Sequence, residues 1–167
     1  SIDPGWSSPC SFGLSARDFE GNIHRIFTYY EEQKRPQDHA KDILKMIQDC
    51  KWTDGRMPYM IVSGKDAFAH KDRYAIIAND VTFADVFRDE GLVLTPATTD
   101  RKQGWWAWKS LLPDKYFIFE GMNQPLIDEI SAVISDGKDV EDIQGRGNDP
   151  NVSDHALDES RYSIMAM

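Results

Sequence analysis

The pattern of apolar and polar residues predicts strands in the first part of the chain and a long helix after them. A short apolar stretch at 11–15 runs through a polar turn at 18–22 into residues 23–30, whose side chains alternate as in a strand. Two such runs joined by a short turn are typical of a hairpin. Pro36 then opens a segment whose apolar residues recur at helical spacing and end before Trp52. We therefore expect a hairpin followed by a helix.

Strands and helices alternate along the rest of the chain. The continuous apolar run at 58–62 ends in Ser-Gly, as a buried strand does when it turns into a loop. Thr82 is suited to cap a helix that stops at Gly91. The spacing then predicts a strand at Leu92–Leu94, a helix from Trp105 to Leu112, a strand from Tyr116 to Phe119, a helix from Gln124 to Ile134 and a helix from Asp154 to Met167. This alternation predicts an α/β fold, a mixed sheet with helices on both faces.

One stretch lacks such a pattern. Residues 135–153 hold three glycines and a proline among charged side chains, with few apolar anchors. Stretches of this composition run over protein surfaces and are more mobile than the elements they connect. We expect an exposed, mobile loop over 135–153.

Length and charge narrow the class of protein. The chain has 167 residues, of which 41% are hydrophobic, enough for one domain spanning 1–167 with a substantial core. The formal net charge of −9 argues against a surface that coats DNA through many cationic contacts, so any nucleic-acid binding must be local. The same acidic balance is what a carboxylate metal site produces. An acidic chain therefore does not exclude a nuclease.

The cysteines, the hydropathy and the first residues bear on where the protein resides and on whether the chain is part of a longer one. Cys10 and Cys50 lack the spacing of a redox or zinc motif, and a reduced cytosolic compartment is the simpler assumption. The sequence contains no apolar run long enough for a membrane span, so no membrane partner is expected. It begins without Met and runs directly into a strand-like motif at 1–5. We interpret the chain as a domain excised from a longer protein.

Three segments, in order across almost the whole chain, carry a family resemblance. The first is Ser1-Ile2-Asp3-Pro4-Gly5-Trp6, an aspartate on a first strand before a glycine. The second begins at Val62-Ser63-Gly64-Lys65-Asp66-Ala67 and continues through Thr82-Phe83-Ala84-Asp85 to Asp100-Arg101-Lys102-Gln103-Gly104-Trp105. The third is Asp154-His155-Ala156-Leu157-Asp158-Glu159-Ser160-Arg161-Tyr162. Together they resemble the C-terminal nuclease domain of phage terminase large subunits, which implies a ribonuclease-H-like fold and an N-terminal ATPase domain outside this chain.

The resemblance implies an endonuclease that uses two divalent ions, Mg²⁺ or Mn²⁺, held by Asp3, Asp66 and Asp158. Asp3 is the candidate bridging ligand. Phosphodiester hydrolysis needs cations at both the attacking and the leaving oxygen, and two hard cations held by carboxylates supply them. The second segment departs from the family pattern, because Asp66 is followed by Ala67 where an Asp-Pro is usual. Three clustered carboxylates repel one another, so we also expect at least one raised pKa.

The same resemblance implies partners and a location. The substrate is double-stranded viral DNA, cut as a concatemer when packaging starts and ends. The terminase small subunit and the portal protein are the implied partners of the full-length protein. The host cell cytoplasm, and transiently the procapsid portal, is the implied location.

The roles of several residues in or near these motifs each have two interpretations. Asp154, His155 and Asp158 are spaced to share one side of a helix. Asp154 is either a further acidic site residue or a helix N-cap. His155 is either catalytic, as a metal ligand, a proton carrier or the group that orients the attacking water, or an inert exposed histidine. Lys65 either contacts the scissile phosphate or is a solvated surface lysine.

Other basic residues have mainly structural interpretations. Arg161 and Tyr162 are expected to brace the closing helix through a carboxylate pair and packing. The nearest feature to a basic stripe consists of Arg101, Lys102 and Lys109, and the tryptophans between them are expected in the core.

Two other classes remain open. One is another ribonuclease-H-like nuclease, of the resolvase or transposase type, which would cut junctions. The other is a noncatalytic docking module whose acidic residues only cap helices and solubilise the surface. A docking module needs no metal, so metal binding separates it from the nucleases.

Overall fold

A computed structural model of the chain describes residues 1–5, 8–69, 81–133, 142–143 and 153–167. Its elements, in order, are β1 (Ile2–Asp3), β2 (Cys10–Arg17), β3 (Ile23–Glu31), α1 (Pro36–Gln48), β4 (Ile61–Ser63), the 3-10 helix η1 (Lys65–Phe68), α2 (Phe83–Asp89), β5 (Leu94–Pro96), α3 (Arg101–Leu111), β6 (Tyr116–Ile118), α4 (Gln124–Ala132) and α5 (His155–Ala166).

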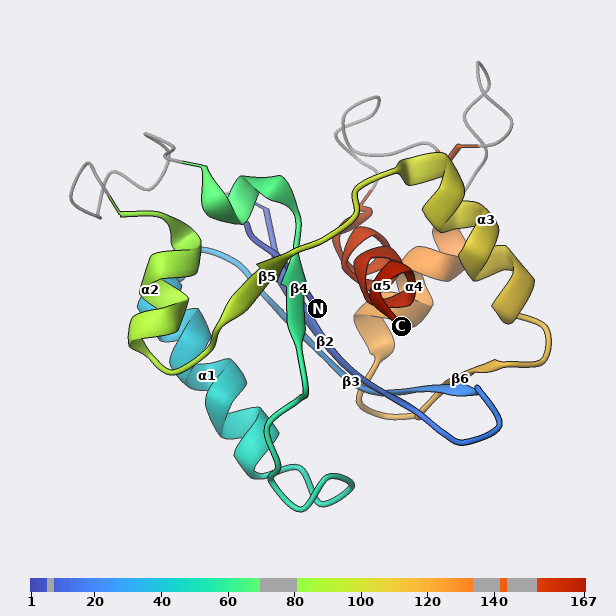
Figure 1. The fold of residues 1–167 in the computed structure, drawn as a ribbon, viewed down its shortest axis with the longest axis horizontal. Coiled ribbons are helices and arrows are strands. Elements are labelled where there is room, and N and C mark those ends of the chain that lie inside the picture. The colour runs from blue at the N-terminus through green and yellow to red at the C-terminus, as the bar shows by residue number, and fades with distance from the viewer. Residues whose placement is uncertain (6–7, 70–80, 134–141, 144–152) are drawn as a thin grey trace.

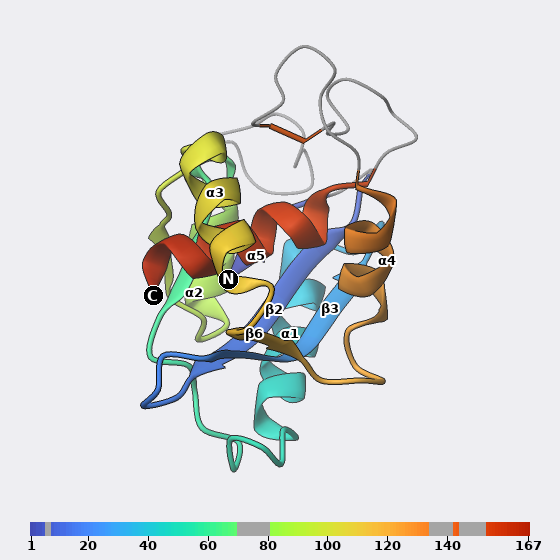
Figure 2. The ribbon, with the colours of Figure 1, turned by 90° about the vertical axis from the view of Figure 1, so that its right-hand side faces the viewer.

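The strands of the described residues form one mixed sheet in the order β5-β4-β1-β2-β3-β6. β1, β2 and β3 pair antiparallel, whereas β4 runs parallel to β1, β5 parallel to β4, and β6 parallel to β3. Helices α1 and α2 cover one face, and α3, α4 and α5 lie on the other (Figure 1; Figure 2). The predicted α/β sheet with helices on both faces is thus confirmed.

Alternation along β2 separates the two faces. Cys10, Phe12 and Leu14 join the core under α1, where Ile43 and Ile47 are fully buried. Successive side chains of a strand point to opposite faces, so the residues between them face the other layer. These are Ser11, Gly13 and Ser15, all small. α5 crosses β1, β2 and β4 on this side, where small side chains leave it room.

The α5 face has a second core and a buried charge. Trp105 and Trp108 of α3 pack with Leu126 of α4 and Leu157 of α5. The side chain of Arg25 lies over Gly13, where a Cβ atom would come within 1.7 Å of Arg25 Nη1. Gly13 is therefore needed for close approach, because any larger residue would displace the guanidinium.

Most predicted elements are confirmed, with shifted ends. The hairpin and the helix from Pro36 form as expected, and Thr82 caps α2 in a reciprocal capping box with Asp85. The strand predicted at Leu92–Leu94 instead runs over Leu94–Pro96. Leu92 closes the preceding helix, since its backbone N–H donates to Phe87 O at 2.8 Å. α3 starts four residues earlier than predicted because Asp100 caps it.

The predicted mobile loop at 135–153 lies mostly outside the described residues. At the three residues that are described, 142–143 and 153, the side chains are partly or fully buried, unlike the exposed positions expected. Ile143 is buried, with 8% of its surface exposed, in the core cluster that contains Trp105. Asp142 accepts a hydrogen bond from Trp105 Nε1 at 2.9 Å.

Candidate active site

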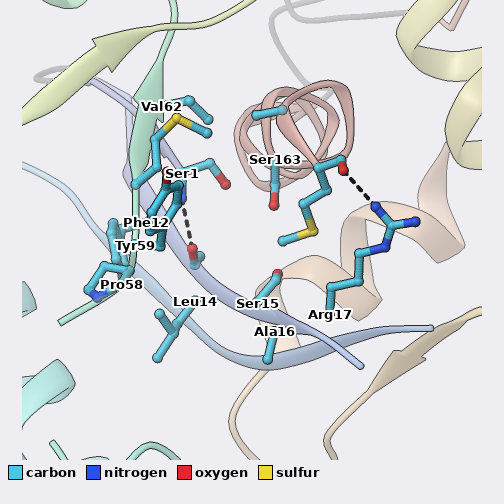
Figure 3. A pocket seen from close by; sticks show the side chains of 14 residues that line it. Ser1, Phe12, Leu14, Ser15, Ala16, Arg17, Pro58, Tyr59, Val62 and Ser163 are labelled. Carbon is cyan, nitrogen blue, oxygen red and sulfur yellow. Dashed lines mark hydrogen bonds between the residues drawn. The ribbon is translucent and has the colours of Figure 1, made fainter. Parts of the chain in front are cut away.

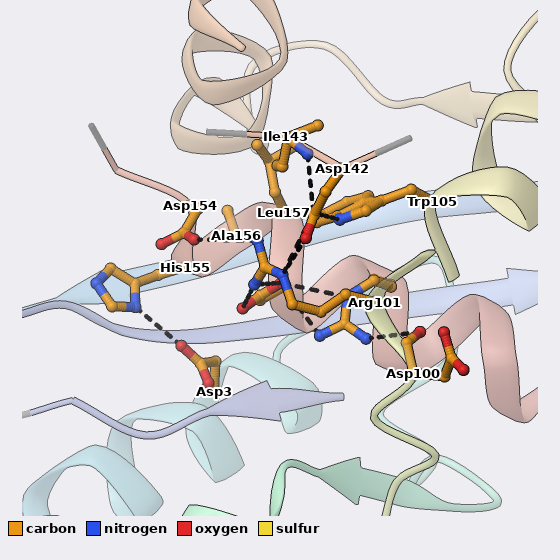
Figure 4. A network of polar contacts seen from close by, with 12 residues as sticks. Asp3, Asp100, Arg101, Trp105, Asp142, Ile143, Asp154, His155, Ala156 and Leu157 are labelled. Atoms are coloured by element: carbon orange, nitrogen blue, oxygen red, sulfur yellow. Dashed lines mark hydrogen bonds and ion pairs between the residues drawn. The ribbon is translucent and has the colours of Figure 1, made fainter. Parts of the chain in front are cut away.

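Asp3 lies at the end of the central strand β1, beside the first turn of α5. A hydrogen bond of 2.8 Å joins Asp3 Oδ2 to His155 Nδ1 (Figure 4). The two side chains are 19% and 13% exposed, so solvent reaches both. Residues from the two ends of the sequence therefore meet at one place on the surface.

Two contacts from neighbouring elements fix α5 on the sheet. Glu129 of α4 is buried, and its Oε2 accepts hydrogen bonds from the backbone N–H groups of Ala156 and Leu157, at 2.8 and 3.0 Å. Arg25 of β3 forms a fully buried ion pair with Glu159, with Nη2 2.5 Å from Oε2. These contacts set the position of His155 and Asp158, which lie in the first turn of the same helix.

Asp154 does not cap α5 with its side chain, so the capping interpretation is wrong. Asp154 occupies the N-cap position, but its side chain accepts no bond from the helix N–H groups. Glu129 takes that role. The Asp154 carboxylate instead lies 3.8 Å from Arg101 Nη2.

Asp158 is held by two arginines. Arg101 Nη1 lies 3.1 Å from Asp158 Oδ1 and 3.0 Å from Oδ2. Arg161, one turn along α5, donates to Oδ1 through Nε and Nη2, both at 3.2 Å. The expectation that Arg161 braces the helix through a carboxylate is confirmed. The contacts of Arg101 with Asp158, Asp142 and Asp154 were not anticipated from the sequence.

Burial and the charges of this cluster shift the pKa of Asp3 and of His155. Burial is the largest effect on Asp3; together with the charges of Asp158 and Asp154, and against the opposing effect of His155, it raises the pKa of Asp3 to about 6. Burial lowers the pKa of His155, but the hydrogen bond and the charge of Asp3 outweigh it, so the net shift is upward. The expected carboxyl with a raised pKa is therefore Asp3. Both shifts favour retention of a proton by this pair.

Asp66 and Lys65 lie on η1, which begins two residues after β4, and both side chains are exposed. β4 runs parallel to β1, with Ser63 paired to Ile2, so both chain segments leave the sheet at the same edge. Within the described residues, the hydrogen bonds and ion pairs seen for Asp3 and Asp158 do not involve Asp66. The exposure of Lys65 agrees with a solvated surface lysine.

The donor chemistry of the site fits a hard divalent cation. Asp3 and Asp158 offer partly exposed carboxylate oxygens, the ligand type that Mg²⁺ prefers, and their charges interact. Within the described ranges, no three His, Cys, Asp and Glu side chains are grouped closely enough to hold a metal ion. Carboxylate-based binding therefore requires side chains of this cluster to rearrange.

The tryptophans of α3 divide between core and surface. Trp105 and Trp108 are buried as predicted, but Trp106 is 76% exposed. The roles of Glu129, Asp142 and Glu159 have no signal in the sequence, because each acts through a partner distant in the chain. For Arg25, the one signal is an arginine within a predicted strand.

A separate cavity of about 450 Å³ contains none of the predicted site residues. It lies between β2, the segment 58–62 and the end of α5, where Arg17 Nη1 donates to Met167 O at 2.7 Å (Figure 3). The acidic cluster is therefore not part of this cavity. We place the candidate site at the cluster because the titratable side chains converge there.

The sheet and its flanking helices define an α/β domain of the ribonuclease-H-like class. No protein-family model matches the chain, and no curated protein does. Similar solved structures include the P22 large terminase nuclease domain, with a TM-score of 0.72 and 14% identity, covering 99% of this chain and 78% of that one. The large terminase nuclease domain of bacteriophage SPP1 with bound Mn has a TM-score of 0.63 and 13% identity, with coverages of 98% and 82%.

The large terminase of a thermophilic bacteriophage, in complex with ATP-γ-S, is also similar. Its TM-score is 0.70 at 20% identity, and the match covers 98% of this chain. The chain spans only 38% of the length of that terminase. It therefore has the fold of a phage large terminase nuclease domain, as the sequence resemblance predicted. At these identities the likeness establishes the fold alone.

Proposed function

We propose that the chain is the metal-dependent DNA endonuclease domain of a viral genome-packaging terminase, cutting concatemeric double-stranded DNA when packaging starts and ends. The observation that supports this proposal most strongly is the contact of Asp3 with His155, close enough to Asp158 for its charge to act on Asp3, in a fold shared over 98–99% of the chain with terminase structures. The bound Mn of the SPP1 domain supports divalent-metal dependence. In addition, no described helix is long and apolar enough to cross a membrane.

Asp3, Asp66 and Asp158 are the proposed ligands of two Mg²⁺ or Mn²⁺ ions, with Asp3 as the shared ligand. Bound cations would activate the attacking water and stabilise the charge on the leaving oxygen. The parallel pairing of β1 and β4 supports Asp66, since η1 follows β4 at the edge where Asp3 lies. The exposed position of Asp66 means that its carboxylate must turn toward the sheet.

His155 orients Asp3 and carries a proton in this proposal. Its Nδ1 binds Asp3 Oδ2, which fixes the carboxylate and leaves Oδ1 for a ligand. The raised pKa of His155 favours the protonated imidazole, which can give a proton to the leaving oxygen or a phosphate oxygen. Asp154 adds negative charge beside the pair without direct ligation.

The partners follow from the terminase assignment. Double-stranded viral DNA is the substrate, and the small subunit and portal protein act through the full-length protein. The proposed location is the host cell cytoplasm, with transient residence at the procapsid portal. Lys65, exposed on η1 next to Asp66, is a secondary candidate for contact with the DNA phosphate.

A Mn²⁺ titration and a plasmid-cleavage assay on matched variants test the proposal. Asp3→Asn, Asp66→Asn and Asp158→Asn should each abolish cutting, because each removes a ligand. Asp54→Asn is the matched control, since Asp54 is 81% exposed and pairs only with Arg56 among the ion pairs seen for the described residues. Its cutting should equal that of wild type.

Three results would contradict the proposal. A wild-type domain that binds no Mn²⁺ and nicks no plasmid favours the noncatalytic docking module. Cutting of four-way junctions but not of linear duplex favours a resolvase type. Full activity in Asp66→Asn removes Asp66 from the site.

A further inference from the structure

Arg101 is the first residue of α3 and lies among three aspartate side chains. Its guanidinium contacts Asp158 at 3.0 Å, Asp142 at 3.4 Å and Asp154 at 3.8 Å (Figure 4). One cation thus serves three carboxylates. A guanidinium among several carboxylates stands where a hard cation would find oxygen ligands.

The two arginines on Asp158 are held very differently. Arg161 is 2% exposed, and its guanidinium lies 4.7 Å from the ring centre of Tyr162 and 5.4 Å from that of Trp105. Its Nη1 also donates to the backbone oxygen of Asp100 at 3.3 Å. Arg101 also lies over the Trp105 ring, 5.7 Å from its centre, but it is 34% exposed and its bonds to Asp142 are long, at 3.4 Å. Arg161 is therefore held inside the protein, whereas Arg101 borders solvent and is the more easily displaced of the two.

The two carboxylate oxygens of Asp158 also differ in which arginine they bind. Oδ1 accepts from both arginines, whereas Oδ2 accepts from Arg101 alone among the hydrogen bonds seen for the described residues. Loss of Arg101 would free Oδ2 while Arg161 still orients the carboxylate through Oδ1. Asp142 would remain within reach of the released guanidinium.

We infer that Arg101 occupies the cation position on Asp158 in the metal-free protein, and that divalent metal must displace it to bind there. Arg161 is the positioning residue that keeps Asp158 oriented during the exchange. The inference rests on the proposed metal site. It goes beyond that proposal because it makes Arg101 a built-in competitor that sets the metal affinity.

Competition between Arg101 and a metal ion predicts the direction in which metal affinity changes when Arg101 is removed. A group that binds a site in the free protein weakens the apparent affinity of any ligand that must displace it. Arg101→Ala should therefore bind Mg²⁺ about tenfold more tightly than wild type, the size expected for one charged hydrogen-bonded contact. If Arg101 only held the site together, its loss would disorder Asp158, and Arg101→Ala would bind Mg²⁺ more weakly than wild type.

Two measurements on the whole domain test the exchange. Calorimetric titration with Mg²⁺ compares wild type, Arg101→Ala and Lys102→Ala; the last removes an equal charge from the next residue of α3. In parallel, the arginine Nε–Hε resonances of the wild-type domain are followed during the same titration. Arg101 and Arg161 are assigned by the signals lost in Arg101→Lys and Arg161→Lys.

We expect Arg101→Ala to bind Mg²⁺ more tightly than wild type, and Lys102→Ala to differ from wild type in Mg²⁺ affinity by less than about twofold. During the titration of wild type, the Arg101 resonance should move toward the position of a free arginine while the Arg161 resonance stays in place. Unchanged or weaker binding in Arg101→Ala, or an Arg101 resonance that stays fixed at saturating Mg²⁺, would overturn the inference while leaving the metal site intact. Absence of Mg²⁺ binding in every protein would instead overturn the proposed function, and the exchange with it.

Discussion

Replacement of Glu129 by alanine should destabilise the domain more than any change at Asp154, although Asp154 occupies the N-cap position. The Glu129 carboxylate is 6% exposed and accepts from the N–H groups of Ala156 and Leu157 and from the hydroxyls of Tyr30 and Ser153. Its removal leaves two helix donors without this acceptor. Each unsatisfied buried donor costs about 1–3 kcal/mol, so we expect a loss of about 3 kcal/mol.

The graded variants make the magnitude testable. Glu129→Gln keeps one acceptor oxygen, and its loss should be about half as large. Asp154→Ala should lose less than about 1 kcal/mol, because the side chain makes no hydrogen bond to the helix N–H groups. In a domain of this length, a loss of about 3 kcal/mol lowers the melting temperature by about 6–12 °C.

Urea unfolding followed by circular dichroism measures these losses, and Mn²⁺ titration of the same variants reports on the site. Since Glu129 fixes the turn that carries His155 and Asp158, Glu129→Ala should also weaken metal binding. An Asp154→Ala loss equal to or larger than that of Glu129→Ala would refute the assignment of the cap to α4.

Three further outcomes follow from other contacts. Glu159→Gln should cost about 3–5 kcal/mol in urea unfolding by leaving Arg25 buried without its partner, and replacing both by apolar residues should recover most of it; no recovery would contradict the pairing. Burial lowers the pKa of His39 from 6.5 to about 4, so the neutral imidazole stabilises the fold above pH 6.5 and this stability is lost as the pH falls toward 4. The difference is about 3 kcal/mol, and His39→Gln should lack it in melts across this range. Gly104→Ala would bring a Cβ within 2.4 Å of Arg161 Cγ, so metal affinity should fall and stability should drop by about 1–3 kcal/mol; unchanged Mn²⁺ binding would show that Arg161 does not position the site.

Local signals in the sequence predicted the elements better than their ends. The Thr82 cap was visible because donor and acceptor lie three residues apart, and the capping box forms as expected. The start of β5 was misplaced because Leu92 is apolar for a different reason, namely its burial at the turn after α2. Hydrophobicity alone does not separate a buried turn from a strand.

The site was predicted in part for a similar reason. Asp3, His155 and Asp158 belong to motifs, and the structure brings Asp3 and His155 into contact. The cap from Glu129 and the pairing of Arg101 with Asp142 bridge 27 and 41 residues. Such contacts depend on the packing of α3 and α4 against α5, which periodicity does not encode.

The central claim is that Asp3, Asp66 and Asp158 together hold two divalent ions. A crystal structure of the domain soaked with Mn²⁺, with data collected for the anomalous signal of manganese, tests it most directly. The account predicts two anomalous peaks about 3.5–4 Å apart, with Asp3 between them and Asp66 and Asp158 each ligating at least one. Peaks elsewhere on the domain, or an Asp66 carboxylate that stays turned to solvent beside an occupied site, would contradict it.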